Sequence, residues 1–227
     1  HDSHNFVLVS RSEWNARPPT IVVRLETPVE FVVIHHTYQP GACHSTEQCS
    51  QAMRGMQNYH QESNGWGDIG YNFAVGGDGK AYEGRGWNAV GAHTYGFNIK
   101  SIGIVAFIGT NIFFFTVEIP PAKQLEVVHK LIAVGVEMGI IRPDYKLIGH
   151  RQAGSTECPG EALFNEISKW DHFQPLSNEL RNFVNKTDYL LKCCIYYYVI
   201  HIKLYHPPIT YNLILPTILA VPATSSA

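Results

Sequence analysis

Charged residues are scarce in this sequence. Asp, Glu, Lys and Arg make up 16% of the 227 residues, and the formal net charge is −2. No basic stripe is present, so a nucleic acid is a poor candidate for a partner. Hydrophobic residues reach 45%, which is enough for a folded core and excludes a wholly disordered chain. The length suits one domain with an appendage.

A long uninterrupted apolar run is also absent. The tail from about Lys186 is rich in Tyr, Ile, Leu and Pro, but Lys192, Lys203 and several prolines interrupt it. A membrane-spanning helix needs about 20 predominantly apolar residues, so we expect no membrane anchor. We interpret residues 179–227 as a poorly ordered extension. The segment 111–116 is equally atypical, since it places one Ile and three Phe in what should be a surface connection.

Cysteine is limited to five residues. Cys43 and Cys49 are close in the sequence, Cys158 stands alone, and Cys193 and Cys194 are adjacent. An odd number leaves at least one thiol that is unpaired or held by a metal. The supply of histidine is large, with twelve residues, so metal binding is a hypothesis worth testing.

Short β-branched runs alternate with helical patterns along the chain. Ser45 and Gln48 have capping-box spacing, which predicts a helix that ends before Asn64. Pro120 opens a second helix that Gly139 ends, and a third covers about residues 161–169. The first thirty residues are expected to form an irregular arm. The predicted strands are Phe31–Ile34, Tyr71–Val75, Lys80–Glu83, Ser101–Ile108 and Tyr145–Gly149. This alternation predicts an α/β fold with a central mixed β-sheet.

Three potential metal ligands stand at or near predicted strand ends. His35 follows the first buried strand, His150 follows the last one, and Cys158 lies eight positions later in a loop. Two imidazoles and a thiolate suit Zn²⁺ and leave a fourth position for water. Taken alone, a histidine at a strand end is more often a hydrogen-bonded structural residue, and a lone cysteine is usually a small core residue. The residues by themselves therefore leave both interpretations open.

Several longer motifs stand out along the chain. They are Phe31–Thr37, Gly65–Phe73, Tyr82–Trp87, Gly91–Thr94, Ser101–Ile104, Gly149–Gln152 and Thr156–Gly160. These motifs resemble those of the peptidoglycan recognition proteins, above all the insect amidase branch of that family, and the similarity runs in order from about Val9 to Phe173. The resemblance implies a phage lysozyme-type amidase fold, with a central mixed sheet flanked by three helices. It places an N-terminal arm at residues 1–8 and the peptidoglycan recognition domain at residues 9–178.

The resemblance also implies an enzyme, because the zinc ligands of the catalytic members match His35, His150 and Cys158. The implied activity is N-acetylmuramoyl-L-alanine amidase, which hydrolyses the lactyl amide of peptidoglycan. Zinc lowers the pKa of its bound water toward about 7, and the phenol of Tyr71 can stabilise the developing oxyanion. Phage enzymes carry a lysine where this chain has Thr156, a neutral and weaker donor that we keep as a catalytic candidate.

Other site residues follow from the same resemblance. It implies a disulfide between Cys43 and Cys49 and hence an oxidising compartment. We expect a secreted protein whose signal peptide was removed or not included, because no leader precedes His1. The expected partner is peptidoglycan of the meso-diaminopimelate type, and the expected role is to dampen innate immune signalling. The candidate substrate-binding residues are His36, Thr37, Trp66, Arg85 and His93.

Three alternatives remain at this point. The chain could be a receptor module that binds peptidoglycan without cutting it. It could be a zinc peptidase, although it contains no His-Glu-x-x-His helix motif. The segment 111–116 and the tail could also mark a misassembled sequence that folds poorly. The complete set of ligands with Tyr71 favours the amidase.

Overall fold

A mixed β-sheet forms the centre of the protein. The structure, a computed structural model, describes residues 5–108, 110–111, 116–117 and 120–175. The sheet has six strands in the order β1-β4-β3-β5-β2-β8, and of its neighbouring pairs only β3 and β4 run antiparallel. The strands are β1 (Leu8–Val9), β2 (Val29–His36), β3 (Phe73–Val75), β4 (Ala81–Glu83), β5 (Ser101–Ala106) and β8 (Ile141–Gly149). The mixed sheet predicted from the sequence is confirmed.

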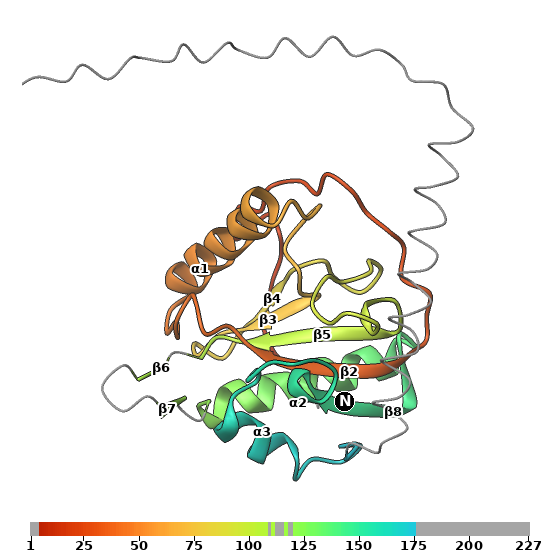
Figure 1. Ribbon diagram of the computed structural model, residues 1–227. Helices are drawn as coiled ribbons and strands as arrows, with labels where there is room; N and C mark the ends of the chain where they lie inside the picture. Colours follow the sequence, from red (N-terminus) through yellow and green to blue (C-terminus); the bar gives the residue numbers. More distant parts are fainter. Residues whose placement is uncertain (1–4, 109, 112–115, 118–119, 176–227) are drawn as a thin grey trace, which may run out of the picture. The chain divides into compact units, whose positions relative to one another are not determined.

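Helices cover both faces of this sheet (Figure 1). Helix α1 lies on one face, and α2 and α3 lie on the other. The α-helices are α1 (Thr46–Asn58), α2 (Ala122–Glu137) and α3 (Glu161–Ile167). Shorter elements are the π-helix η1 (Tyr59–Ser63), the 3₁₀ helices η2 (Asn98–Lys100) and η3 (His150–Gln152), and the paired strands β6 (Thr110–Asn111) and β7 (Thr116–Val117). The expected arrangement of a sheet flanked by three helices is therefore present.

The helix boundaries follow from local chemistry. The side chain of Ser45 accepts a hydrogen bond from the backbone N–H of Gln48, which satisfies a free donor at the start of α1. The chain continues from α1 into η1, so the helical region ends before Asn64, as predicted. Gly139 follows α2 with a positive φ of 68°, a conformation that favours glycine and ends the helix.

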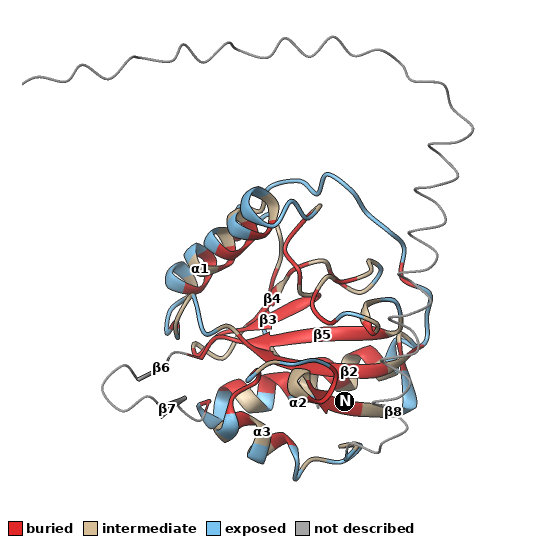
Figure 2. Ribbon diagram, in the orientation of Figure 1, coloured by how far each residue is buried: buried red, intermediate tan, exposed pale blue. Residues whose placement is uncertain are grey.

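The core is divided by the sheet into two apolar layers. Successive side chains of a strand point to opposite faces, and the central strand β2 is apolar on both. Val32 and Ile34 pack with α2 and α3, whereas Phe31 and Val33 pack toward the opposite face. Figure 2 shows the central strands buried throughout and the helices exposed on their outer sides. Since β2 and β5 are buried on both faces, their ends are fixed positions on which a site can be built.

The expectation of an irregular N-terminal arm is wrong in part. Leu8 and Val9 form β1, which pairs in parallel with β4 at the edge of the sheet. Trp14 is fully buried, and its indole N–H donates to the carbonyl of Glu83. These contacts join segments about seventy residues apart, so local sequence patterns gave no sign of them.

Several predicted boundaries also shift. Strand β3 begins at Phe73 rather than Tyr71, β5 ends at Ala106 rather than Ile108, and α3 ends at Ile167. Strand β8 begins at Ile141, earlier than predicted. Residues 112–115 and the extension 179–227 lie outside the described residues. Within the described part of the chain, no helix is long and apolar enough to cross a membrane.

Candidate metal centre

The register of two parallel strands places the two histidines side by side. Ile34 of β2 pairs with Gly149 of β8, and the residue that follows each of them is a histidine. His35 is fully buried near the end of β2, and His150 begins η3 directly after β8. Their ring centroids are 4.6 Å apart. The carboxyl ends of these strands therefore present two imidazoles to one point.

Cys158 completes the cluster from the loop between η3 and α3. Its Sγ lies 3.6 Å from Nδ1 of His35, and the backbone N–H of His36 donates to the same sulfur over 3.4 Å. One ligand atom each from His35, His150 and Cys158 lies within 4.8 Å of the others. Two imidazoles and one thiol fit a divalent metal such as zinc, which binds nitrogen and sulfur ligands. The structure thus brings together the three ligands predicted from the sequence.

Burial sets the protonation of these groups. It lowers the pKa of His35 well below its usual value, and electrostatic interaction with the neighbouring imidazoles of His93 and His150 lowers it further. Burial lowers the pKa of His150 to about 4. Both rings are therefore neutral at pH 7, which is the form that binds a metal. The Cys158 thiol has its pKa raised to about 12 by burial, and a bound metal ion would favour its deprotonation.

Tyr71 lies beside the cluster. It stands two residues before β3, and its ring centroid is 5.1 Å from that of His35. Burial raises the pKa of the Tyr71 phenol above its ordinary value, and the nearby Cys158 thiol adds to this effect. The hydroxyl therefore keeps its proton at neutral pH and remains available as a hydrogen-bond donor.

Thr156 supports the loop that carries the thiol. Its hydroxyl accepts a hydrogen bond from the backbone N–H of Cys158 over 3.2 Å. Arg151 steadies the same loop, because its guanidinium donates to the carbonyl of Glu157 and its backbone N–H donates to the carbonyl of Cys158. The contact that the structure shows for Thr156 is thus with the backbone of the loop that carries Cys158.

The predicted binding residues around the cluster differ in their contacts. His36 is buried, and its Nδ1 has no hydrogen-bond partner among the described residues. The hydroxyl of Thr37 lies 3.4 Å from the carbonyl oxygen and 3.3 Å from the backbone nitrogen of Ile108, which ties the end of β2 to the segment after β5. His93 lies against His35, with 3.0 Å between its Nδ1 and Nε2 of His35.

His60 is a site neighbour that the sequence did not single out. The centroid of its ring lies 4.8 Å from that of Trp66 and 5.9 Å from that of Tyr71. Nδ1 of His60 accepts the backbone N–H of Gly70 over 3.0 Å, and burial lowers its pKa to about 4. His60 lies in the π-helix η1, where its side chain is buried. Its contact with Trp66 depends on the turn that follows η1.

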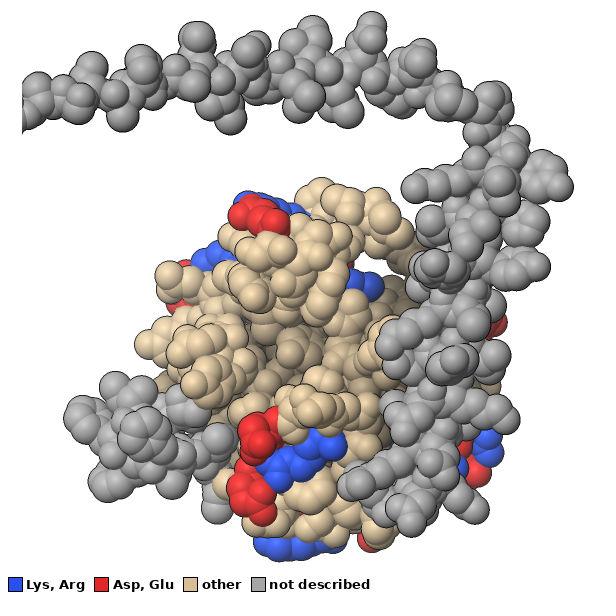
Figure 3. Space-filling view, in the orientation of Figure 1, with Lys and Arg blue, Asp and Glu red and all other residues tan. Residues whose placement is uncertain are grey.

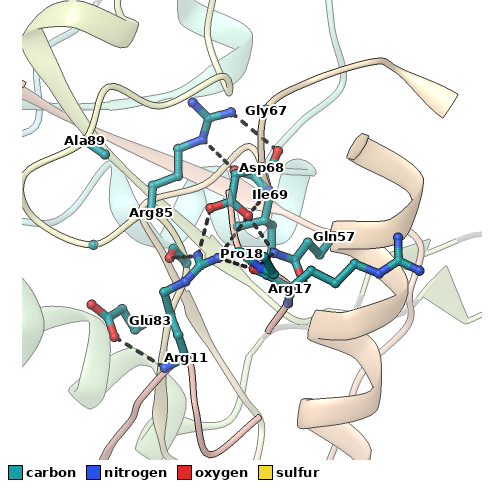
Figure 4. A network of polar contacts seen from close by, with 12 residues as sticks. Arg11, Arg17, Pro18, Gln57, Gly67, Asp68, Ile69, Glu83, Arg85 and Ala89 are labelled. Atoms are coloured by element: carbon teal, nitrogen blue, oxygen red, sulfur yellow. Dashed lines mark hydrogen bonds and ion pairs between the residues drawn. The ribbon is translucent and has the colours of Figure 1, made fainter. Parts of the chain in front are cut away.

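Arg85 is anchored to the backbone of Asp68 and Ile69 (Figure 4). Its Nε donates to the carbonyl of Ile69 over 2.6 Å, and its Nη1 donates to that of Val90 over 2.7 Å. The carboxylate of Asp68 pairs with Arg11 over 2.9 Å and accepts from Gln57 over 2.7 Å. Burial lowers the pKa of Arg85 somewhat, although the Asp68 charge opposes this. Arg85 is therefore a partly buried cation with a fixed guanidinium plane.

Tyr71, His93 and Thr94 are uncharged neighbours of the metal ligand His35. In the face shown in Figure 3, the middle is hollowed and uncharged, and a group of acidic and basic side chains lies below the hollow. Two neutral histidines stand at adjacent strand ends of a mixed sheet, and a buried thiol and a protonated phenol lie beside them. This set of groups is that of a metal-dependent hydrolase. The fold and the site together define this class of protein.

Comparison with known proteins specifies the family. Residues 25–161 match the family model described as N-acetylmuramoyl-L-alanine amidase. Peptidoglycan-recognition protein LB of Drosophila melanogaster is 50% identical over 171 residues, which cover 75% of this chain and 72% of that protein. The N-acetylmuramoyl-L-alanine amidase of Homo sapiens is 45% identical over 169 residues, covering 72% of this chain and 28% of that protein.

A solved structure agrees with this assignment. Peptidoglycan recognition protein-LE in complex with tracheal cytotoxin, a monomeric diaminopimelic acid-type peptidoglycan, superposes with a TM-score of 0.69 at 44% identity. The match covers 74% of this chain and 96% of that one. The chain therefore belongs to the N-acetylmuramoyl-L-alanine amidase family and, within it, to the peptidoglycan-recognition proteins.

Proposed function

We propose that this protein is a zinc-dependent N-acetylmuramoyl-L-alanine amidase that binds bacterial peptidoglycan. Hydrolysis adds water across the amide between the lactyl group of N-acetylmuramic acid and L-alanine. The products are a lactyl carboxylate and a stem peptide with a free amino group. The observation that carries the proposal is the convergence of His35, His150 and Cys158 within 4.8 Å, in a chain of the amidase family.

Each residue has a defined part in this proposal. His35, His150 and Cys158 would hold the zinc, which would act as a Lewis acid and lower the pKa of a bound water molecule. Tyr71 keeps its proton and donates a hydrogen bond to the oxygen on which negative charge develops. Thr156 fixes the loop of Cys158 through its contact with the backbone N–H. The catalytic role predicted for Thr156 therefore rests only on the position of its hydroxyl in the loop that carries Cys158.

The substrate is proposed to be peptidoglycan of the meso-diaminopimelate type. This type carries an additional carboxylate on the third residue of the stem, and a planar guanidinium suits a carboxylate. The proposal rests on Arg85, whose plane is held by the carbonyls of Ile69 and Val90. It is supported by peptidoglycan recognition protein-LE, which was solved with a diaminopimelic acid-type fragment. Trp66, His36, Thr37 and His93 are proposed to line the same substrate site.

We further infer that the protein is secreted and dampens innate immune signalling by destroying peptidoglycan fragments. The disulfide expected from the resemblance is present between Cys43 and Cys49, and disulfides persist in oxidising compartments. The domain is proposed to span residues 9–178, with β1 extending its N-terminal boundary by one residue.

A digestion experiment tests the activity. Purified peptidoglycan is incubated with the protein, with the protein and a chelator, and with the chelated protein after zinc is returned. The proposal predicts release of stem peptides with free L-alanine amino groups in the first and third samples only. Peptidoglycan binding without release in any sample would identify a receptor module instead. Release that a chelator leaves unchanged would contradict the zinc mechanism.

A further inference from the structure

The second nitrogen of His35 has its own contacts on the side away from Cys158. Nε2 of His35 lies 3.0 Å from Nδ1 of His93 and 3.3 Å from the hydroxyl of Thr94. The Thr94 hydroxyl lies 3.1 Å from the same Nδ1 of His93. Three polar atoms thus form a closed triangle behind the ring of His35. Nδ1 of His35 faces the opposite way, toward the sulfur of Cys158.

This arrangement selects one tautomer of His35. A neutral imidazole that gives Nδ1 to a metal must carry its proton on Nε2. The proton then needs an acceptor, because a buried donor without a partner is unfavourable. Nδ1 of His93 and the hydroxyl of Thr94 are both able to accept it. Metal-binding histidines commonly donate their other N–H in this way, which fixes the ring and makes it a better ligand.

The acceptors are themselves held in place. The side-chain oxygen of Asn98 accepts the backbone N–H of His93 over 2.9 Å and that of Thr94 over 2.8 Å. Gly91 and Gly103 provide the space for the ring of His93, since a Cβ atom at either position would overlap it. Gly103 lies within the buried strand β5, where a glycine otherwise weakens a strand. Its place there is explained by the close approach of His93.

The ring of His93 is used on one side only. Its Nε2 is buried and has no hydrogen-bond partner among the described residues. If Nδ1 accepts from His35, the proton of His93 must sit on this unpartnered Nε2. The protein therefore tolerates an unfavourable buried group in order to offer Nδ1 to His35. A ring that only filled the core would not need a nitrogen atom directed at His35.

We propose that His93 and Thr94 are positioning residues for the metal ligand His35, supported by Asn98 and Gly103. They hold the proton on Nε2 of His35 and keep Nδ1 directed at the metal. This inference rests on the metal site of the proposed function. It is separate from the substrate contact proposed for His93, and it concerns metal affinity in the absence of substrate.

Zinc affinity of the purified protein tests the proposal. The metal is removed, and zinc is titrated in competition with a chromophoric chelator for the parent and for Thr94→Val, His93→Phe and the double variant. Loss of a hydrogen-bond partner behind a metal ligand lowers metal affinity about 10- to 100-fold. We expect this loss for the double variant and smaller losses for the single ones. Thr94→Ser keeps the hydroxyl and should bind zinc like the parent, as should the exposed control Thr20→Val.

Folding of the metal-free protein separates positioning from structure. Circular dichroism and thermal unfolding with a chelator present should be similar for the parent and the Thr94→Val variant. Nitrogen-15 NMR of the metal-free parent gives a measurement that needs no variant, and it should find the His35 proton on Nε2.

Two results would overturn the inference. One is zinc affinity of a folded double variant within about threefold of the parent, where a lost partner should lower it at least 10-fold. The other is a His35 proton on Nδ1 in the metal-free parent. A parent that binds no zinc would contradict the proposed metal centre instead, so the two failures are distinguishable.

Discussion

His35 and His150 lie with their ring centroids 4.6 Å apart because each directly follows one residue of the last pair between the parallel strands β2 and β8. The last paired residues are Ile34 and Gly149, and a one-residue change of register would turn every side chain beyond it to the other face. The geometry of the metal centre is thus a property of the sheet. Cys158 is added by a loop, and its position depends on the contact with Thr156.

The Tyr71→Phe variant tests the phenol as an oxyanion donor. The change removes the hydroxyl and keeps the ring that packs beside His35. Loss of one such donor lowers turnover on the order of 100-fold or more, while zinc content and peptidoglycan affinity should stay near those of the parent. Turnover is measured by release of stem peptide at saturating substrate. A value within about threefold of the parent would make Tyr71 a packing residue.

Variants of Arg85 test the substrate type. Arg85→Ala should weaken binding of diaminopimelate-type fragments by roughly 1.5–3 kcal/mol, the range for a hydrogen bond to a charged group. Binding of lysine-type fragments should be nearly unchanged. Because Arg85 also binds backbone carbonyls, Arg85→Lys serves as the control that keeps the charge but loses the planar fork. Calorimetric titration with both fragments measures the ratio of their dissociation constants for each variant. An equal loss for both types would remove Arg85 from the specificity.

His60 should make the stability of the metal-free protein depend on pH. Its pKa is lowered to about 4 by burial, whereas an unfolded histidine has a pKa of about 6.5. The unfolded chain therefore binds more protons in this interval, and stability is lost as the pH falls from about 6.5 toward 4. His60→Asn keeps an acceptor for the N–H of Gly70 but does not titrate.

Urea unfolding with a chelator at pH 7 and pH 5 checks this dependence. The variant should lose less unfolding free energy between the two pH values than the parent does. An identical loss in both proteins would show that His60 does not contribute to the acid sensitivity.

The disulfide between Cys43 and Cys49 should stabilise the start of α1. The bond closes a short loop, with a sequence separation of 6. A loop of this size corresponds to a stabilisation of about 2 kcal/mol, so the double variant Cys43→Ser with Cys49→Ser should lose that amount in urea unfolding. Thiol labelling of the denatured parent without a reductant should leave both residues unmodified. Free reactivity of both in protein from its native compartment would remove the main support for secretion.

Much of the fold could be predicted because the signals are local. The cap at Ser45, the buried run from Phe31 to Ile34 and the glycine after α2 each depend on neighbouring residues, and the structure contains the elements that they predict. The convergence of the three ligands was also predicted, since two of them follow strands and the third lies in a short loop. The motif resemblance decided between a structural and a metal-binding interpretation.

The remaining features depend on contacts between distant segments. Strand β1 pairs with β4 across more than seventy residues, and no pattern within residues 1–30 indicates that pairing. The contacts of His60 with Trp66 and of Thr94 with His35 likewise depend on how loops close over the sheet. The motif resemblance identified Arg85 as a candidate substrate-binding residue. Its hydrogen bonds to the carbonyls of Ile69 and Val90 could be seen only in the folded chain.

The most direct test of the metal mechanism is the Cys158→Ser variant, measured for both hydrolysis and binding. Serine is similar in size and can still accept the N–H of His36, so the site should remain folded. Its hydroxyl is a poor substitute for a thiolate ligand of zinc. The account predicts loss of metal and no release of stem peptide, with peptidoglycan binding retained. Hydrolysis by Cys158→Ser at the rate of the parent would contradict it.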